Sequence, residues 1–168
     1  NNLTVTCAFR SQHLFDNSHP LYAGDIGIGI NPRLANRIKQ SDLLIAIGPR
    51  LGEITTSGYS LLEVPTPAQK LIHVHSGAEE IGRVYQPTLG INSSPSTFVN
   101  CLANMKTLPK NYKKNSQEAR QEYLKWSTIS NKAETLDLSR IIVWLRENTP
   151  ANSIITNGAG NYSAWIHR

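Results

Sequence analysis

The feature of this sequence that most limits its fold is the alternation of short apolar runs with amphipathic segments. The three runs are residues 42–48 (DLLIAIG), 70–75 (KLIHVH) and 88–92 (TLGIN). The first of these, continuous and apolar, is typical of a strand buried on both faces of a parallel sheet. Amphipathic segments that open with Asn-Pro and Ser-Pro cover residues 32–40 and 95–105, so both are expected to be helices. Strands and helices at this spacing predict right-handed crossovers and an α/β, Rossmann-like parallel sheet flanked by helices.

Further elements are expected around this core. Residues 3–9 (LTVTCAF) predict a strand, and residues 76–83 predict a short helix after the second apolar run. An exposed helix is expected over residues 116–132. A helix over residues 138–148 should lead through Pro150 to a strand at residues 153–156.

The composition changes at Lys106. Residues 106–115 (KTLPKNYKKN) are polar and basic and contain a proline, which is typical of a linker. We therefore divide the chain into a first unit over residues 1–105, a linker and helix over 106–135, and a partial second α/β unit over 136–168.

Composition excludes several classes of protein. No run approaches the roughly 18 apolar residues that a membrane helix needs, so we expect no membrane-spanning segment. Cys7 and Cys101 are the two cysteines and lie far apart, which disfavours a disulfide scaffold or zinc site and favours a cytoplasmic location. The chain opens without a basic or apolar leader, so we expect no signal peptide and a sequence that is part of a longer chain.

The net charge of +5 does not indicate nucleic-acid binding. Much of the excess lies in one polar stretch without base-stacking aromatic residues. Its cations are Lys106, Lys110, Lys113, Lys114, Arg120 and Lys125. We expect a linker and a solvated helix face there.

Two segments of the first unit are candidates for ligand binding. Residues 22–30 (YAGDIGIGI) include Gly24 and Gly27 but match no P-loop, so they form either a sharply turning loop or a loop that admits a ligand. Gly48 and Arg50 directly follow the first apolar run, and the carboxyl ends of parallel strands are where such sheets bind ligands. Arg50 is therefore either an anion ligand or an ordinary surface arginine.

Two histidines alternate on the second apolar run. His73 and His75 share one face of that strand, but no further His, Cys or Asp cluster completes a metal site. We therefore expect no metal ligands in this chain. Glu79 and Glu80 begin the short helix that follows and are expected to be surface acids that complement its dipole.

A glycine-rich turn near the end of the chain is the third candidate. Gly158, Gly160, Asn161 and Tyr162 follow the strand expected at residues 153–156 and open a helix. Free backbone N–H groups at such a turn suit a phosphate.

Four segments, in this order, carry a resemblance to a known family. They are residues 15–24 (FDNSHPLYAG), 41–50 (SDLLIAIGPR), 71–87 (LIHVHSGAEEIGRVYQP) and 157–165 (NGAGNYSAW). Together they resemble the thiamine-diphosphate-dependent enzymes of the acetolactate synthase type, over nearly the whole chain.

The resemblance implies an assignment for each unit. Such enzymes have a pyrimidine-binding, a central and a diphosphate-binding α/β domain. Residues 1–105 would be most of the central domain, without its usual first strand and helix. Residues 106–135 would connect the domains, and 136–168 would begin the diphosphate-binding domain. Gly158, Gly160, Asn161 and Tyr162 would then contact thiamine diphosphate.

The resemblance also implies that this chain alone is inactive. The family's glutamate that activates the aminopyrimidine belongs to the absent first domain, and the G-D-G…N segment that binds Mg²⁺ would lie beyond Arg168. The parent enzyme is expected to be a lyase or transferase that acts on a 2-oxo acid. It is also expected to be a homo-oligomer through the domains absent here.

Departures from the family pattern leave rival interpretations open. Members with a flavin or nucleotide have a D-I-D-P-like turn where this chain has residues 75–78 (HSGA), so a ribose contact by FAD or ADP has no support. Tyr162 stands where acetolactate synthases usually have His. One rival is a nucleotide- or CoA-binding module without catalysis, with Gly24, Gly27, Gly48, Arg50 and His75 as its site. The other is a scaffold for subunit assembly.

Overall fold

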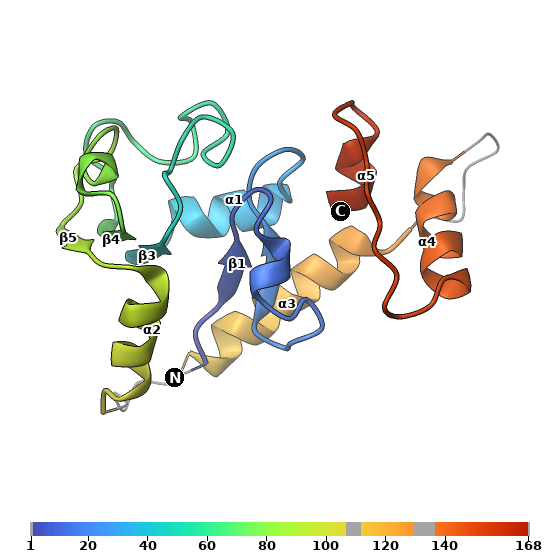
Figure 1. The fold of residues 1–168 in the computed structure, drawn as a ribbon, viewed down its shortest axis with the longest axis horizontal. Helices are drawn as coiled ribbons and strands as arrows, with labels where there is room; N and C mark the ends of the chain where they lie inside the picture. Colours follow the sequence, from blue (N-terminus) through green and yellow to red (C-terminus); the bar gives the residue numbers. More distant parts are fainter. Residues whose placement is uncertain (1, 107–111, 130–136, 168) are drawn as a thin grey trace.

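The computed structural model describes residues 2–106, 112–129 and 137–167 (Figure 1). Its described strands form two parallel sheets, and the parallel arrangement confirms the prediction from the three apolar runs. The smaller sheet pairs β1 (Val5–Cys7) with β2 (Tyr22–Asp25). The larger sheet has the order β3-β4-β5, with β3 (Leu43–Ile47), β4 (Lys70–His75) and β5 (Leu89–Asn92). Leu44 of β3 lies opposite Leu71, and Ile72 of β4 lies opposite Leu89.

Two predicted helices begin as their sequences indicate. α1 (Pro32–Lys39) joins β2 to β3, and Asn31 Oδ1 accepts a hydrogen bond of 3.0 Å from the Arg33 N–H. α2 (Pro95–Ala103) follows β5, and Ser94 Oγ accepts a hydrogen bond of 3.2 Å from the Thr97 N–H. Two short 3-10 helices complete this unit, η1 (Gln12–Leu14) and η2 (Ala78–Glu80). The short helix expected over residues 76–83 is thus reduced to η2.

α3 (Lys113–Ser127) corrects the expectation of an exposed helix. Ala119 is buried, and the Tyr123 ring packs edge-on against Tyr22 of β2 with ring centroids 5.1 Å apart. Arg120, assigned to a solvated face, donates hydrogen bonds to the backbone carbonyls of Asn17 (2.9 Å) and Tyr22 (3.2 Å). The polar sequence did not reveal these contacts, because Arg120 and the two glutamates of the helix bond with the first unit.

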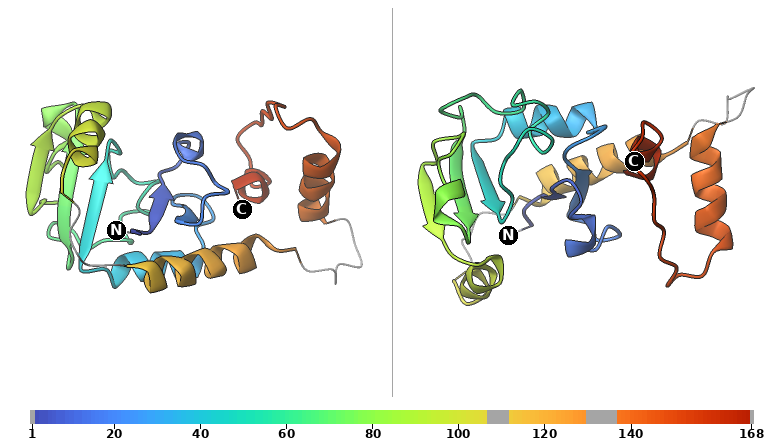
Figure 2. Two further views of the ribbon diagram at one scale, coloured as in Figure 1. Left: turned by 90° about the horizontal axis from the view of Figure 1, so that it is seen from below. Right: turned by 45° about the horizontal axis from the view of Figure 1, so that its top comes forward.

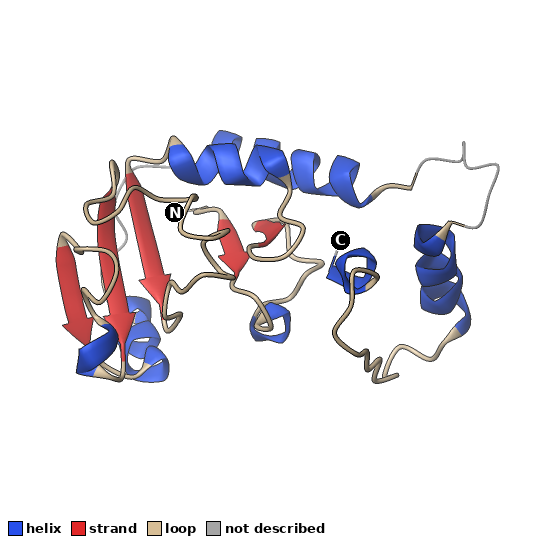
Figure 3. Cartoon of the chain, turned by 90° about the horizontal axis from the view of Figure 1, so that it is seen from above, coloured by secondary structure: helices blue, strands red, loops and turns tan. Residues whose placement is uncertain are grey.

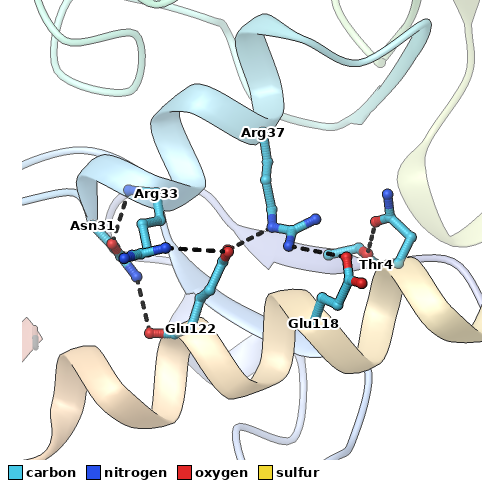
Figure 4. A network of polar contacts seen from close by, with 7 residues as sticks. Thr4, Asn31, Arg33, Arg37, Glu118 and Glu122 are labelled. Carbon is cyan, nitrogen blue, oxygen red and sulfur yellow. Dashed lines mark hydrogen bonds and ion pairs between the residues drawn. The ribbon is translucent and has the colours of Figure 1, made fainter.

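A polar network joins α3 to α1 (Figure 4). Arg37 donates through Nε to Glu122 Oε2 and lies 3.7 Å from Glu118 Oε2. Arg33 lies 3.8 Å from Glu122 Oε1, and Asn31 Nδ2 donates to the Glu122 carbonyl at 3.4 Å. The hydrogen bond from Arg37 holds the pKa of the Glu122 carboxyl below its usual range and raises the pKa of Arg37.

The second unit contains α4 (Leu138–Asn148) and α5 (Ser163–His167). Asp137 begins α4, as its Oδ1 accepts a hydrogen bond of 2.9 Å from the Ser139 N–H. The strand predicted at residues 153–156 is wrong, because these residues pair with no strand in the described structure. Ile154 is 90% exposed, so its apolar side chain has no layer to pack against.

One hydrophobic core connects the two sheets. It combines Ala23 of β2, Ala46 of β3, Leu71 of β4, Leu34 of α1 and Ala119 of α3. Figure 3 shows the strands of both sheets running in the same direction, with β1 the next strand beyond β3. Figure 2 shows the same order and places α1 and α3 side by side. The two sheets therefore belong to one layered unit.

β3 corrects the expectation of a strand buried on both faces. Gly48 N–H donates to Val74 O at 2.8 Å and Lys70 N–H donates to Asp42 O at 3.1 Å, so the even-numbered residues of β3 bond with β4. The backbone groups of Leu43, Ile45 and Ile47 therefore point to the other edge, which pairs with no described strand. Leu43 is 44% exposed in consequence.

Candidate functional site

Gly48 and Arg50 follow β3, and His75 ends β4, so all three lie at the carboxyl edge of the larger sheet. His73, buried within β4, holds the loop after β3 through a hydrogen bond of 2.9 Å between its Nε2 and the Pro49 carbonyl. His75 Nδ1 accepts a hydrogen bond of 3.0 Å from the Gly77 N–H. Both histidines thus fix loops at this edge.

Glu80 is a residue that the sequence analysis assigned wrongly. It was expected at the surface, yet it is only 7% exposed. Arg83 Nη1 lies 3.0 Å and Arg50 Nε 3.7 Å from the same Glu80 oxygen. Arg83 follows Glu80 by three residues, and this spacing could have predicted an ion pair between them. Two exposed guanidinium groups therefore share one buried carboxylate, and the exposed carboxylate of Glu79 lies nearby against Gly77, so the two cations are balanced by two acids.

Gly24 lies within β2 of the smaller sheet, and Gly27 lies in the loop after β2, which borders residues 53–58 of the loop after β3. Gly24 has φ +110°, and a Cβ there would stand 3.2 Å from Tyr123 Cδ2. Gly27 has φ +134°, and a Cβ there would stand 2.9 Å from Phe9 Cβ. Left-handed backbone and close packing account for both glycines. The structure does not bring them together with Gly48, Arg50 and His75.

In the glycine-rich turn before α5, the glycines make room for the ring of Tyr162. A Cβ at Gly160 would stand 2.6 Å from Tyr162 Cε1, and one at Gly158 would stand 2.9 Å from the Tyr162 hydroxyl. The Tyr162 ring therefore lies against the turn, which only glycine allows. Ser163 also stabilises the turn, because its N–H (2.9 Å) and its Oγ (2.7 Å) both donate hydrogen bonds to the Gly160 carbonyl.

α5, the helix that follows this turn, touches the first unit. A Cβ added at Gly29, whose φ is +74°, would stand 3.6 Å from the Ala164 Cβ of α5. The glycine-rich loop after β2 thus lies next to the helix that follows the turn at residues 157–162.

No three His, Cys, Asp or Glu side chains in the described part of the chain are grouped to hold a metal ion. No described helix combines the length and apolar character needed to cross a membrane.

The fold and the edge site define a Rossmann-like α/β domain, and comparison with known proteins gives its family. The family described as "Thiamine pyrophosphate enzyme, central domain" matches residues 1–102. The chain therefore belongs to the thiamine pyrophosphate enzymes, as the four segments predicted.

Curated relatives of the chain are acetyltransferases. Sulfoacetaldehyde acetyltransferase of Roseovarius nubinhibens is 33% identical over 88 residues, which are 52% of this chain and 14% of the relative. The enzymes of the same name from Alcaligenes xylosoxydans (28%) and Rhodobacter capsulatus (31%) match over 88 residues, 52% of this chain and 15% of each relative. The chain thus spans about one seventh of the length of these relatives.

Proposed function

We propose that this chain is the central domain, joined to the start of the diphosphate-binding domain, of a longer thiamine-diphosphate-dependent enzyme. The enzyme would cleave or form a carbon–carbon bond next to the carbonyl of a 2-oxo acid. The match of residues 1–102 to the central domain of the family carries the proposal. The names of the relatives support the transferase class.

The sheet edges support the proposal that the domain continues outside this chain. β1 and β3 are neighbours in one layer and run in the same direction, and among the described residues each pairs with a strand on one side only. One more strand between them would join the two sheets. Central domains of this family begin with such a strand and helix, which we propose as the missing part.

The turn at residues 157–162 fits a diphosphate. The Tyr162 ring lies over Gly158 and Gly160, so the diphosphate would bind beside the ring, with the Tyr162 hydroxyl and backbone N–H groups of the turn as donors. Asn161 would add an amide donor. When bound, the cofactor supplies the stabilised carbanion of the reaction. The residues of this chain would bind and orient its diphosphate, while Mg²⁺ would be held by the G-D-G…N segment outside the chain.

A phosphate-bearing nucleotide is the second candidate ligand, since the exposed guanidinium groups of Arg50 and Arg83 lie at the sheet edge and could each pair with a phosphate. It would bind beside Gly48 and His75 at the sheet edge. This rival describes a binding module without catalysis, and the scaffold rival predicts no small ligand at all. Titration of ADP, FAD and acyl-CoA separates these two rivals.

Turnover by the complete gene product tests the proposal. Decarboxylation of a 2-oxo acid should require added thiamine diphosphate and Mg²⁺. A complete gene product that binds ADP but neither binds thiamine diphosphate nor consumes any 2-oxo acid would favour the nucleotide module.

A further inference from the structure

Three consecutive residues in the loop after β3 have left-handed backbone. Ser57, Gly58 and Tyr59 have φ of +53°, +65° and +60°. Residues with a side chain adopt this conformation singly as a rule, because their Cβ comes too close to the following carbonyl oxygen. Strained backbone of this kind clusters at ligand clamps and switch regions and persists only where other contacts enforce it. The loop therefore stores strain in the conformation described here.

Hydrogen bonds within the loop hold this conformation, but they leave one polar group unpaired. Gly58 N–H donates to Glu53 O at 2.8 Å, and Thr56 N–H donates to Gly52 O at 3.0 Å. Ser57 Oγ is buried and has no hydrogen-bond partner among the described residues. Because a buried hydroxyl without a partner is unfavourable, a second conformation that pairs or exposes it is favoured relative to this one.

The loop borders a groove into which it has room to move. The groove has a volume of about 460 Å³, and residues 27–30 after β2 form its opposite wall. Ile28 on that wall and Ile54 on the loop are 45% and 49% exposed. A Cβ added at Gly52 or Gly58 meets no described atom within 4 Å, so both glycines have space to rotate. Closure of the groove would remove two aliphatic side chains from water, which stabilises the closed state.

We infer that residues 52–60 are a strap with two conformations, the strained open one described above and a closed one in which the strap folds onto residues 27–30. Closure relaxes the left-handed residues, lets Ser57 Oγ find a partner and packs the two isoleucines against each other. The inference is independent of the proposed function, because it concerns two loops of this chain only.

The strap lies between the two candidate sites of the chain. It begins at Gly52, shortly after Arg50 at the carboxyl edge of the larger sheet. On the other wall of the groove, a Cβ at Gly29 would stand 3.6 Å from Ala164 of α5, the helix that follows the turn at residues 157–162. Closure therefore changes access to the sheet edge and bears on the loop that touches α5.

Methyl relaxation dispersion on the complete gene product, with isoleucine methyl groups labelled, tests the strap, because it detects loop exchange between microseconds and milliseconds. The methyl groups of Ile28 and Ile54 should show exchange at one shared rate. Ser57→Gly combined with Tyr59→Gly removes the strain of the open conformation, so the exchange contribution should fall by about tenfold. Ile28→Asp should abolish exchange at Ile54, because closure would bury a carboxylate.

Ser60→Gly is the matched control, since Ser60 belongs to the same loop and its φ is not positive. It should retain the exchange at Ile54, and circular dichroism must show each variant folded. Three results would each overturn the strap. They are absence of dispersion at Ile54 in the wild type, different exchange rates at Ile28 and Ile54, and equal dispersion in the wild type and the double glycine variant.

Discussion

The ring of Tyr162 lies so close to Gly160 that a Cβ at position 160 would stand 2.6 Å from Tyr162 Cε1. Contacts this short force a neighbour to move, so the identity of residue 160 determines where the tyrosine ring lies. The turn that we assign to the diphosphate is therefore one packed unit of glycine and tyrosine.

Gly160→Val in the complete gene product should weaken thiamine diphosphate by about tenfold or more, because the branched side chain displaces Tyr162 and blocks the backbone N–H groups. Arg50→Ala, in the first unit, should leave this affinity unchanged. Both are measured by calorimetric titration at fixed Mg²⁺.

Gly52→Ala is the matched control for a lost glycine, since a Cβ at position 52 meets nothing within 4 Å. It should behave as wild type. Equal dissociation constants for wild type and a folded Gly160→Val would remove the turn from the cofactor site. A larger loss in Arg50→Ala would favour the nucleotide site at the sheet edge instead.

The 168-residue chain alone should not decarboxylate pyruvate or another 2-oxo acid with added thiamine diphosphate and Mg²⁺. Under the proposed division into domains, the activating glutamate and the metal segment of the family would belong to other parts of the enzyme. A coupled assay for the product measures this, with the complete gene product as positive control. Steady turnover by the purified chain, lost on boiling, would contradict the proposed division into domains.

Glu122→Gln should lower the stability of the chain by about 1 kcal/mol at pH 7, because it removes a charge-assisted hydrogen bond between α1 and α3. Arg37 lowers the pKa of Glu122 in the folded state from its ordinary value of 4.5. The stabilisation is therefore present above about pH 4.5 and is lost as the pH falls through the lower, folded-state pKa.

Urea unfolding of wild type and Glu122→Gln at pH 7 and pH 3 measures the effect. Glu118→Gln is the control, since Glu118 is 53% exposed and 3.7 Å from Arg37. It should change stability less. An equal effect of the two variants, or an effect of Glu122→Gln that grows toward low pH, would show that the carboxylate does not hold the two helices together.

Amide hydrogen exchange tests the open edge of β3. In the 168-residue chain, the amides of Ile45 and Ile47 should exchange fast because they point away from β4, whereas Leu44 and Ala46 should be protected. In the complete gene product a further strand should protect Ile45 and Ile47 by about tenfold or more. The same fast exchange in both proteins would show that no strand occupies this edge.

The sequence predicted those elements well whose stabilising contacts are made by residues within this chain. Asn31 and Ser94 begin helices through side-chain bonds that depend on neighbouring residues only, so α1 and α2 were predicted closely. The strand at residues 153–156 failed because a strand requires a partner, and Ile154 has none in the described structure.

The misplaced charges have a similar explanation. Arg120 carries no local mark that separates a solvated charge from a bonded one, because its partner Asn17 lies far along the chain. Glu80 has a local partner in Arg83, but the spacing of the two does not show that the carboxylate is buried. The positions of Gly48 and Arg50 were predicted more closely than the contacts of these charges. Both residues follow a parallel strand, and this places them at the carboxyl edge of the sheet whatever their side chains contact. The role of Tyr162 beside Gly160 required the structure.

Titration of the complete gene product with thiamine diphosphate at fixed Mg²⁺, followed by calorimetry, tests whether the enzyme that contains this chain binds the cofactor. The account predicts saturable binding of one cofactor per chain, abolished or strongly weakened by Gly160→Val and unaffected by Gly52→Ala. A folded complete gene product that shows no saturable binding of thiamine diphosphate would contradict it.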